Sequence, residues 1–411
     1  MSTGPAAAEV TLPRTSVYAQ LRTTPRVFLF MAMLLGGAVS LGAKEVARWQ
    51  YLDEAFDSEW GLGIAAAIAA VAVAISGITV GRMIDRRDPR PFIFVSFLLG
   101  ALSNAMVGLL LLSGPIPAGW IVVASILDGA TFGVGSIALL KVQAAFVNPG
   151  AEGAAEILNI LRLGIGGVIG AVLGGLSPDP ALTLLASAFL LVASTTGLWW
   201  VMRSVTLRPR ARGRTGAIAA LASLRRASAL RGMVGIDLVL AFVIPTQAVN
   251  LVLIGVEAPQ VASLSIASGM VGVLIGRLGL AVVGFRGNPR RLLTVAVVGL
   301  AVCQIAGSLA LTDGWLIRQL FALPAIIIVG SILSTYAQGI SASIIQQGVP
   351  EEHRGGLAAV LVVGRNALIS TAALGGAALA VAWGPQAFLV VLALGLLAVL
   401  LGSRRFASVP S

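Results

Sequence analysis

A short charged loop between two charge-free apolar runs limits most strongly how this chain can fold. Residues 81–90 carry six charged side chains in ten positions. The runs on either side, 61–80 and 91–112, contain no Asp, Glu, Lys or Arg. Each run can cross a hydrocarbon core of about 30 Å, which takes about 20 helical residues. The loop must lie in water beside a membrane, and its richness in Arg predicts the cytoplasmic side.

The composition agrees with a chain that crosses a membrane many times. It is 57% hydrophobic and 11% charged, with a mean hydropathy of +0.96, whereas about a quarter of a soluble protein is charged. The net charge of +11 is explained by cytoplasmic loops rich in Arg, so we expect no nucleic-acid partner. Cys303 and His353 are single, which disfavours metal sites and His-based catalysis. We therefore expect no cofactor, no metal and no enzymatic activity.

Further apolar runs of membrane-spanning length follow one another along the chain. We predict an all-α membrane protein with twelve transmembrane helices, arranged as two pseudo-symmetric six-helix bundles. The predicted spans are 27–47, 60–81, 91–112, 118–141, 154–176, 181–202, 231–253, 259–282, 292–312, 319–343, 356–382 and 385–403. An even number of spans places both chain ends on the same side of the membrane.

The basic residues indicate which side that is. On the side of the 81–90 loop we count 22 Lys and Arg residues, and on the other side three. Short loops retain Lys and Arg in the cytoplasm, so both termini are predicted to be cytoplasmic in a multi-pass protein of the cell membrane. The lipid bilayer is then a permanent partner, and we expect a monomer.

One long polar loop divides the spans six and six. The predicted parts are a cytoplasmic arm (1–25), an N-terminal bundle (26–202), a cytoplasmic linker (203–230), a C-terminal bundle (231–405) and a tail (406–411). The halves resemble each other, because Gly81-Arg82 recurs as Gly276-Arg277 and Pro89-Arg90 as Pro289-Arg290. A duplicated six-span unit is typical of transporters in which two halves rock around a central site.

The loop motif resembles one of the major facilitator superfamily. Gly81, Asp85, Arg86 and Arg90 stand at motif positions of the loop between spans 2 and 3, while Asp88-Pro89 replaces the usual Gly-Arg region. The resemblance covers the chain from about 20 to 405 and implies alternating access. It also implies that these four residues form the conformational switch.

Three shorter matches point to a branch of that superfamily. Gly166, Gly170, Gly174 and Gly175 in span 5 are similar to the antiporter motif, with Ala171 in place of its proline. The sequences Leu-Asp-Gly at 127–129, Arg-Leu-Gly at 162–164 and Leu-Arg at 21–22 resemble enterobactin exporters and macrolide efflux pumps. The glycines allow two helix backbones to approach closely, which is compatible with packing alone and with the antiporter resemblance.

Placing an ionisable side chain at membrane depth costs several kcal/mol of free energy. Such a residue therefore indicates an ion pair or a function. Asp128 in span 4 and Arg162 in span 5 lie at similar depths and can pair. The pair is either structural or a proton site, in which protonation of Asp128 frees Arg162 for substrate or for a helix shift. Glu45 is a further proton candidate, while Lys44 and Arg48 on the same helix suggest either an outer gate or interface anchors.

The second half offers its own candidates. Asp237 in span 7 is a proton-coupling candidate, and Arg365 in span 11 either attracts an anionic substrate group or ties two helices together. The remaining substrate-cavity candidates are polar side chains in spans 7 and 10, which make helix–helix contacts equally well: Gln247, Asn250, Tyr336 and Gln338.

These observations predict a secondary active transporter that couples export of small organic molecules, drug-like or siderophore-like, to protons. Uptake or lipid translocation by the same fold is the alternative within transport. A non-transporting membrane receptor or scaffold is the alternative of another class. The substrate, the coupling ion and the direction of transport stay open at this point.

Overall fold

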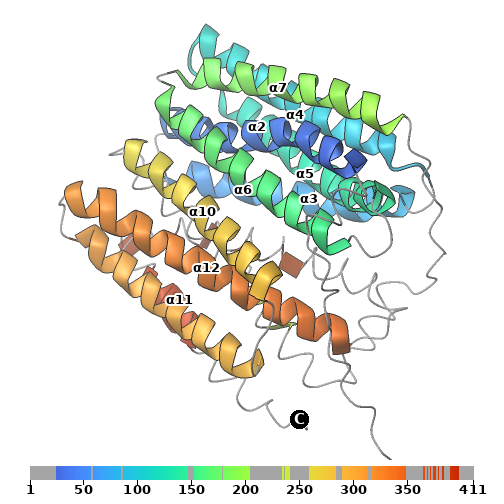
Figure 1. Cartoon of the computed structure of the whole chain (residues 1–411). Helices are drawn as coiled ribbons and strands as arrows, with labels where there is room; N and C mark the ends of the chain where they lie inside the picture. The colour runs from blue at the N-terminus through green and yellow to red at the C-terminus, as the bar shows by residue number, and fades with distance from the viewer. Residues whose placement is uncertain are drawn as a thin grey trace, which may run out of the picture.

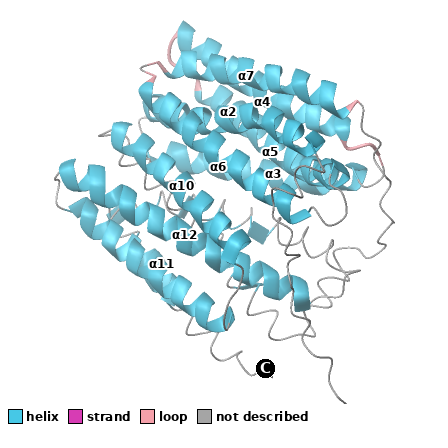
Figure 2. Ribbon diagram, in the orientation of Figure 1, coloured by secondary structure: helices cyan, strands magenta, loops and turns pink. Residues whose placement is uncertain are grey.

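The molecule is built of long helices (Figures 1 and 2). The computed structural model describes residues 25–56, 59–84, 87–146, 152–177, 179–203, 259–283, 289–312 and 316–348, with short pieces within 234–240 and 364–397. The long helices in this part are α2 (Pro25–Phe56), α3 (Glu59–Ile84), α4 (Arg90–Ser113), α5 (Ala118–Phe146), α6 (Glu152–Leu176), α7 (Pro180–Met202), α10 (Pro259–Val283), α11 (Pro289–Thr312) and α12 (Leu316–Gly348).

Each of these helices coincides with a predicted span, which confirms the all-α fold class. Six have the length and hydropathy needed to cross a membrane within the described residues: Val27–Arg48, Arg90–Ser113, Ala118–Ser136, Pro180–Met202, Arg291–Ala310 and Phe321–Ser341. The predicted spans 231–253, 356–382 and 385–403 fall mostly outside the described residues. The largest difference is that α2 continues to Phe56, nine residues beyond its predicted end.

Two helix ends are formed by residue types that favour a helix start or a helix stop. Asp179 caps α7, because its carboxylate accepts a hydrogen bond of 2.8 Å from the backbone N–H of Ala181, and Pro180 occupies the first helical position. Both residue types favour a helix start. Gly114 ends α4 with φ of 131°, a backbone conformation that residues with a side chain rarely adopt.

The helices α2 to α7 pack together as one bundle. The helix α2 contacts α6 and α7, while α4 contacts α5 and α7, and α3 contacts α5. Buried apolar side chains from four helices fill one end of this bundle, among them Phe30, Ile93, Val142 and Leu198. A second cluster around Leu52, Ile121 and Leu184 fills the other end. On the helices α2, α4 and α5, the residues Lys44, Ser103 and Asp128 described below lie between the residues of these two clusters.

The helices α10, α11 and α12 belong to the second bundle, shown from yellow to orange in Figure 1. The helix α12 contacts both α10 and α11. Their core contains Leu300, Ala337 and Leu392, so the piece at 389–397 packs here too. Buried Leu240 joins the same cluster, which places the 237–240 piece in this bundle.

The two bundles meet chiefly along α6 and α10 (Figure 1). The contact is made by small residues of α6 against larger ones of α10. A Cβ on Gly164 would lie 2.8 Å from Cβ of Leu274, and the sulfur of Met270 lies directly over Gly167. Further along, Ala171 forms a buried cluster with Val46 and Ala267. The helix α6 therefore lies between α2 of its own bundle and α10 of the other.

Candidate functional site

A buried ion pair lies in the N-terminal bundle between α2 and α5. The ammonium Nζ of Lys44 contacts Oδ1 of Asp128, and the two side chains are 13% and 9% exposed. The hydroxyl of Ser103 in α4 donates a hydrogen bond of 2.8 Å to the same carboxylate oxygen. Three helices thus supply one anion, one cation and one hydroxyl donor. A charge removed from water needs such partners, because an unpaired one costs several kcal/mol.

More ionisable groups follow Lys44 along α2. Glu45 is the next residue, and Arg48 and Tyr51 lie one and two turns further on. The charges of Glu45 and Asp128 act on both Arg48 and Tyr51. Tyr51 is only 3% exposed. This stretch of α2 together with Asp128 is therefore a cluster of alternating charge rather than a row of surface anchors.

The ion pair that the structure gives for Asp128 is with Lys44, whereas similar depth in the membrane had suggested Arg162. The Nη1 of Arg162 donates a hydrogen bond of 3.3 Å to the backbone oxygen of Leu34 in α2. The cation beside Asp128 is Lys44. The rise of a helix gives the depth of a residue but not the direction in which its side chain points.

A second buried ion pair lies in the C-terminal bundle. Arg365 contacts Asp237 with both ends of its guanidinium: Nε donates to Oδ2 at 2.9 Å and Nη2 to Oδ1 at 2.6 Å. The hydroxyl of Ser341 in α12 also donates to Oδ1, at 3.1 Å. Asp237 is fully buried, whereas the side chain of Arg365 is 35% exposed. Of the two roles considered for Arg365, the structure shows the tie between helices.

The two sites have the same chemistry but use different helices. Each is a buried aspartate held by one cation and one serine hydroxyl from two other segments. In the first half the cation Lys44 lies on span 1 and Asp128 on span 4. In the second half Asp237 lies on span 7, the counterpart of span 1. The pseudo-symmetry of the bundles therefore does not extend to the placement of charge.

The other polar candidates of the second half have structural contacts where they are described. The Tyr336 hydroxyl of α12 lies over Gly279 of α10, since a Cβ there would meet it. For Gln338 the contact is made by the backbone, whose oxygen lies 3.0 Å from the Ser341 hydroxyl and can share its proton with Asp237. Gln247 and Asn250 lie outside the described residues.

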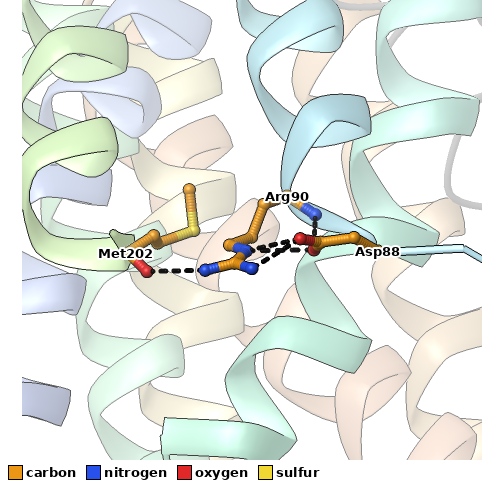
Figure 3. A network of polar contacts seen from close by, with 3 residues as sticks. All are labelled: Asp88, Arg90 and Met202. Carbon is orange, nitrogen blue, oxygen red and sulfur yellow. Dashed lines mark hydrogen bonds and ion pairs between the residues drawn. The ribbon is translucent and has the colours of Figure 1, made fainter. Parts of the chain in front are cut away.

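The loop that opened the sequence argument connects α3 and α4. Arg90 and Asp88 form an ion pair of 2.6 Å, and Nη1 of Arg90 donates to the backbone oxygen of Met202 at 3.2 Å (Figure 3). Arg90 thus links the start of α4 to the last turn of α7, within one bundle. Gly81 lies in the last turn of α3, while Asp85 and Arg86 lie outside the described residues.

Among the described residues of this loop, Asp88 is the acidic group whose pKa is clearly shifted. Partial burial disfavours its charged form, but hydrogen bonds from the side chain and backbone of Arg90, and the charge of Arg90, outweigh that effect. The pKa of Asp88 therefore lies below its ordinary value of 3.8. Its stabilising contribution is present above that ordinary value and is lost as the pH falls through the lowered pKa.

The glycines of α6 lie against the backbone of α2. A Cβ on Gly166 would come within 2.6 Å of Cβ of Ala38, and one on Gly174 within 2.9 Å of the backbone oxygen of Ala43. A Cβ on Gly170 would meet the backbone oxygen of Val39 and lie 2.7 Å from the nitrogen of Ala43. Gly175 is half-buried in the last turn. The stripe lets two helices approach at backbone distance, as small residues do in membranes.

Sequence reasoning missed the serines and the pairing of Lys44. Ser103 and Ser341 are two among many serines in apolar runs, and no local pattern distinguishes them. Lys44 did carry a signal, because it is one of only two lysines in the chain and is predicted to lie inside a span. The predicted end at residue 47 placed it near the membrane surface, whereas α2 extends twelve residues beyond it.

Comparison with known proteins agrees with this architecture. The sequence matches the profile of the Major Facilitator Superfamily over residues 27–373. No curated protein matches it. Among solved structures, the nucleoside transporter NupG is similar with a TM-score of 0.68 and 11% identity; the match covers 94% of this chain and 100% of that one.

Two other solved structures are similar to the same extent. An auto-inhibited peptide transporter of the POT family has a TM-score of 0.71 and 13% identity, with 94% of this chain and 97% of that chain covered. A bacterial homolog of the human lysosomal transporter Spinster, inward-facing and unoccupied, has a TM-score of 0.68 and 12% identity, with coverage of 93% and 97%. At such identities the likeness concerns the fold alone.

Packed bundles of long apolar helices, six of which could span a membrane among the described residues, define a polytopic membrane protein. The chain belongs to the Major Facilitator Superfamily. Transport of a small molecule across a membrane, rather than enzymatic chemistry, is what this membership indicates.

Proposed function

We propose that this protein is a secondary active transporter that exports small organic molecules in exchange for protons, by alternating access between its two bundles. The observation that carries the proposal is the buried Lys44–Asp128 pair with its hydroxyl donor Ser103. Ionisable groups at membrane depth are costly and mark proton or substrate pathways in transporters.

The pair offers a direct way to couple a proton to a change of shape. Protonation removes the charge of Asp128 and leaves the Lys44 ammonium without a counter-ion at membrane depth. An unpaired buried cation costs several kcal/mol. That cost is relieved when Lys44 moves toward water, when it binds an anionic group, or when the bundles rearrange. Release of the proton restores the pair, which makes the site a reversible two-state element.

The charges beyond Lys44 extend this site toward one end of α2. The charges of Glu45 and Asp128 both act on the Arg48 cation, and Glu45 serves in the proposal as a second station for the proton. Asp237 is a weaker candidate, because it is fully buried and held by two hydrogen bonds from Arg365. We assign the second pair a mainly structural role and the first pair the coupling.

The placement of charge and small residues supports the rest of the proposal. The proposal includes bundles at 26–202 and 231–405, with both termini and the Arg-rich 81–90 loop on the cytoplasmic side of the cell membrane. There Gly81, Asp85, Arg86 and Arg90 would act as the conformational switch. The small-residue contact of α6 with α10 is a surface along which the bundles can separate. We expect the transporter to act as a monomer.

The direct test uses everted membrane vesicles with an imposed proton gradient. Substrates come from a growth-inhibition screen of drug-like and siderophore-like compounds against cells that overproduce the protein. Export predicts that vesicles containing the parent protein accumulate such a compound inside. We expect Asp128→Asn to reduce this accumulation at least tenfold, because it retains the shape but cannot exchange a proton at neutral pH.

A matched control is Asp179→Asn, which makes the same change at the cap of α7. Asn caps a helix about as well as Asp, so its accumulation should equal that of the parent. If Asp128→Asn still accumulates compound against its gradient, Asp128 is not the coupling site. If the parent protein accumulates nothing in everted vesicles but does so in right-side-out vesicles, the protein is an importer. Binding without transport in either orientation indicates a receptor.

A further inference from the structure

Two buried amide side chains at matching positions of the two bundles have polar atoms without a hydrogen-bond partner within the residues that the structure describes. Asn104 in α4 is 1% exposed, and neither its Nδ2 nor its Oδ1 has a partner. Gln304 in α11 is 2% exposed, and its Nε2 has none. The two are 200 residues apart, as are Pro89 and Pro289 at the starts of these helices.

The surroundings of Asn104 follow from its neighbours on the same helix face. Gly100 and Gly108 lie one turn before and after it, since residues four apart share a face. A Cβ on Gly100 would lie 3.1 Å from Cγ2 of Thr131 in α5 and 3.4 Å from Cδ1 of Leu191 in α7. Asn104 therefore faces the seam between α5 and α7, inside the bundle.

A second residue with an unpartnered polar group lies in that seam. The hydroxyl of Thr131 is buried and has no hydrogen-bond partner in the described part of the chain. It lies beside Gly100, one turn before Asn104 on α4, because a Cβ on Gly100 would be 3.7 Å from Oγ1 of Thr131. Ser103, the residue before Asn104, binds Asp128. The seam is thus polar at the level of the ion pair.

Such groups are rarely left unpaired. More than about 90% of buried polar groups in proteins have a partner, and an unsatisfied one costs about 1–3 kcal/mol. A buried amide occurs at the same register of both α4 and α11. A hydrogen bond missing by chance in one helix does not explain this recurrence. A ligand must therefore complete these hydrogen bonds.

The ligand has to be small and both a donor and an acceptor. The helix α4 contacts α5, α7 and α2 of its own bundle among the described helices, and the face between the bundles is formed by α6 and α10. The Asn104 side chain is 1% exposed and lies inside the bundle, so a transported substrate has no route to it. Water has the right size, and it typically forms about three hydrogen bonds inside proteins.

We propose that each bundle holds an ordered water molecule at this register, bound to Asn104 and Thr131 in the first half and to Gln304 in the second. These sites lie outside the contact between the bundles, so they persist through the transport cycle. Their role is to keep the polar seam closed and satisfied while the bundles move as units.

The test uses purified full-length protein and the midpoint of thermal unfolding in detergent. Thr131→Val keeps the shape of the side chain and removes only the hydroxyl. If a water is bound there, the substitution removes one of the hydrogen-bond partners of that water. The midpoint of unfolding then falls by several degrees. Thr195→Val is the matched control, because the hydroxyl of Thr195 bonds the oxygen of Leu191 in its own helix, at 2.7 Å. We expect it to change the midpoint by about one degree or less.

A midpoint for Thr131→Val that equals or exceeds that of Thr195→Val would overturn the site in the first bundle, since removing an unpaired hydroxyl stabilises. Gln304→Met, nearly equal in length, tests the second bundle in the same way. An experimental density map that resolves ordered water provides a measurement independent of folding. It must show a solvent peak within hydrogen-bond distance of the Asn104 amide and the Thr131 hydroxyl, and its absence contradicts the proposal.

Discussion

At the scale of single residues, two buried aspartates organise the bundles, and sequence reasoning found both. Membrane depth and charge single out Asp128 and Asp237, because such residues are rare in apolar spans. Their partners were harder to predict. The depth argument paired Asp128 with Arg162, whereas the ammonium of Lys44 reaches it from a helix longer than hydropathy indicates. Hydropathy measures the apolar run and not the helix, so the partner could not be predicted.

The second ion pair leads to an asymmetric prediction. Arg365→Gln should destabilise the protein by about 3–5 kcal/mol, because it leaves a fully buried carboxylate without its cation. Asp237→Asn should cost clearly less, since Arg365 is 35% exposed and can turn toward water. The double variant should be more stable than Arg365→Gln alone. Unfolding midpoints of the purified variants measure all three, and equal losses for the two single variants would show that burial does not decide the cost.

At the scale of helices, the sequence predicts position well and contact poorly. The apolar runs locate each of the long described helices, since about 20 apolar residues are what a span requires. The glycines of span 5 also indicated close packing. Nothing in the sequence shows that Gly166, Gly170 and Gly174 lie against α2 while Gly164 and Gly167 lie against α10, because the partner of a helix face is decided by the tertiary arrangement.

The stripe on α6 can be tested with one methyl group. Gly170→Ala should destabilise the protein by about 1–3 kcal/mol, since the new Cβ meets the backbone of α2 at Val39, which cannot rotate away. Gly119→Ala is the control, because a Cβ there has no heavy atom within 4 Å and alanine favours a helix. Thermal unfolding should show a loss for the first variant and none for the second. Equal midpoints would mean that the α2 backbone moves away from the new methyl group without any loss of stability.

At the scale of the whole molecule, the small-residue contact between the bundles is the surface that alternating access has to open. Ala171 of α6 and Ala267 of α10 belong to one buried cluster across it. Cysteines at both positions, with Cys303 replaced by alanine, should form a disulfide when treated with an oxidant. We expect the cross-linked protein to lose transport and to regain it after reduction of the disulfide.

Each single cysteine provides the control, because it undergoes the same treatment without joining the bundles. Both should transport before and after oxidation. A cross-linked double variant that still transports at the rate of the uncross-linked one would show that this contact stays closed throughout the cycle. The bundles would then have to move about some other surface.

The contact of Arg90 with the end of α7 has a practical consequence for how the protein can be made. Since Arg90 donates to the backbone oxygen of Met202 at 3.2 Å, the last turn of α7 is tied to the start of α4 in its own bundle. We expect that the polypeptide can be divided after Arg203 and its two parts produced together from separate genes. Each half could then carry its own spectroscopic label or isotope. The movement of the labelled bundle could be followed while the other bundle gives no signal.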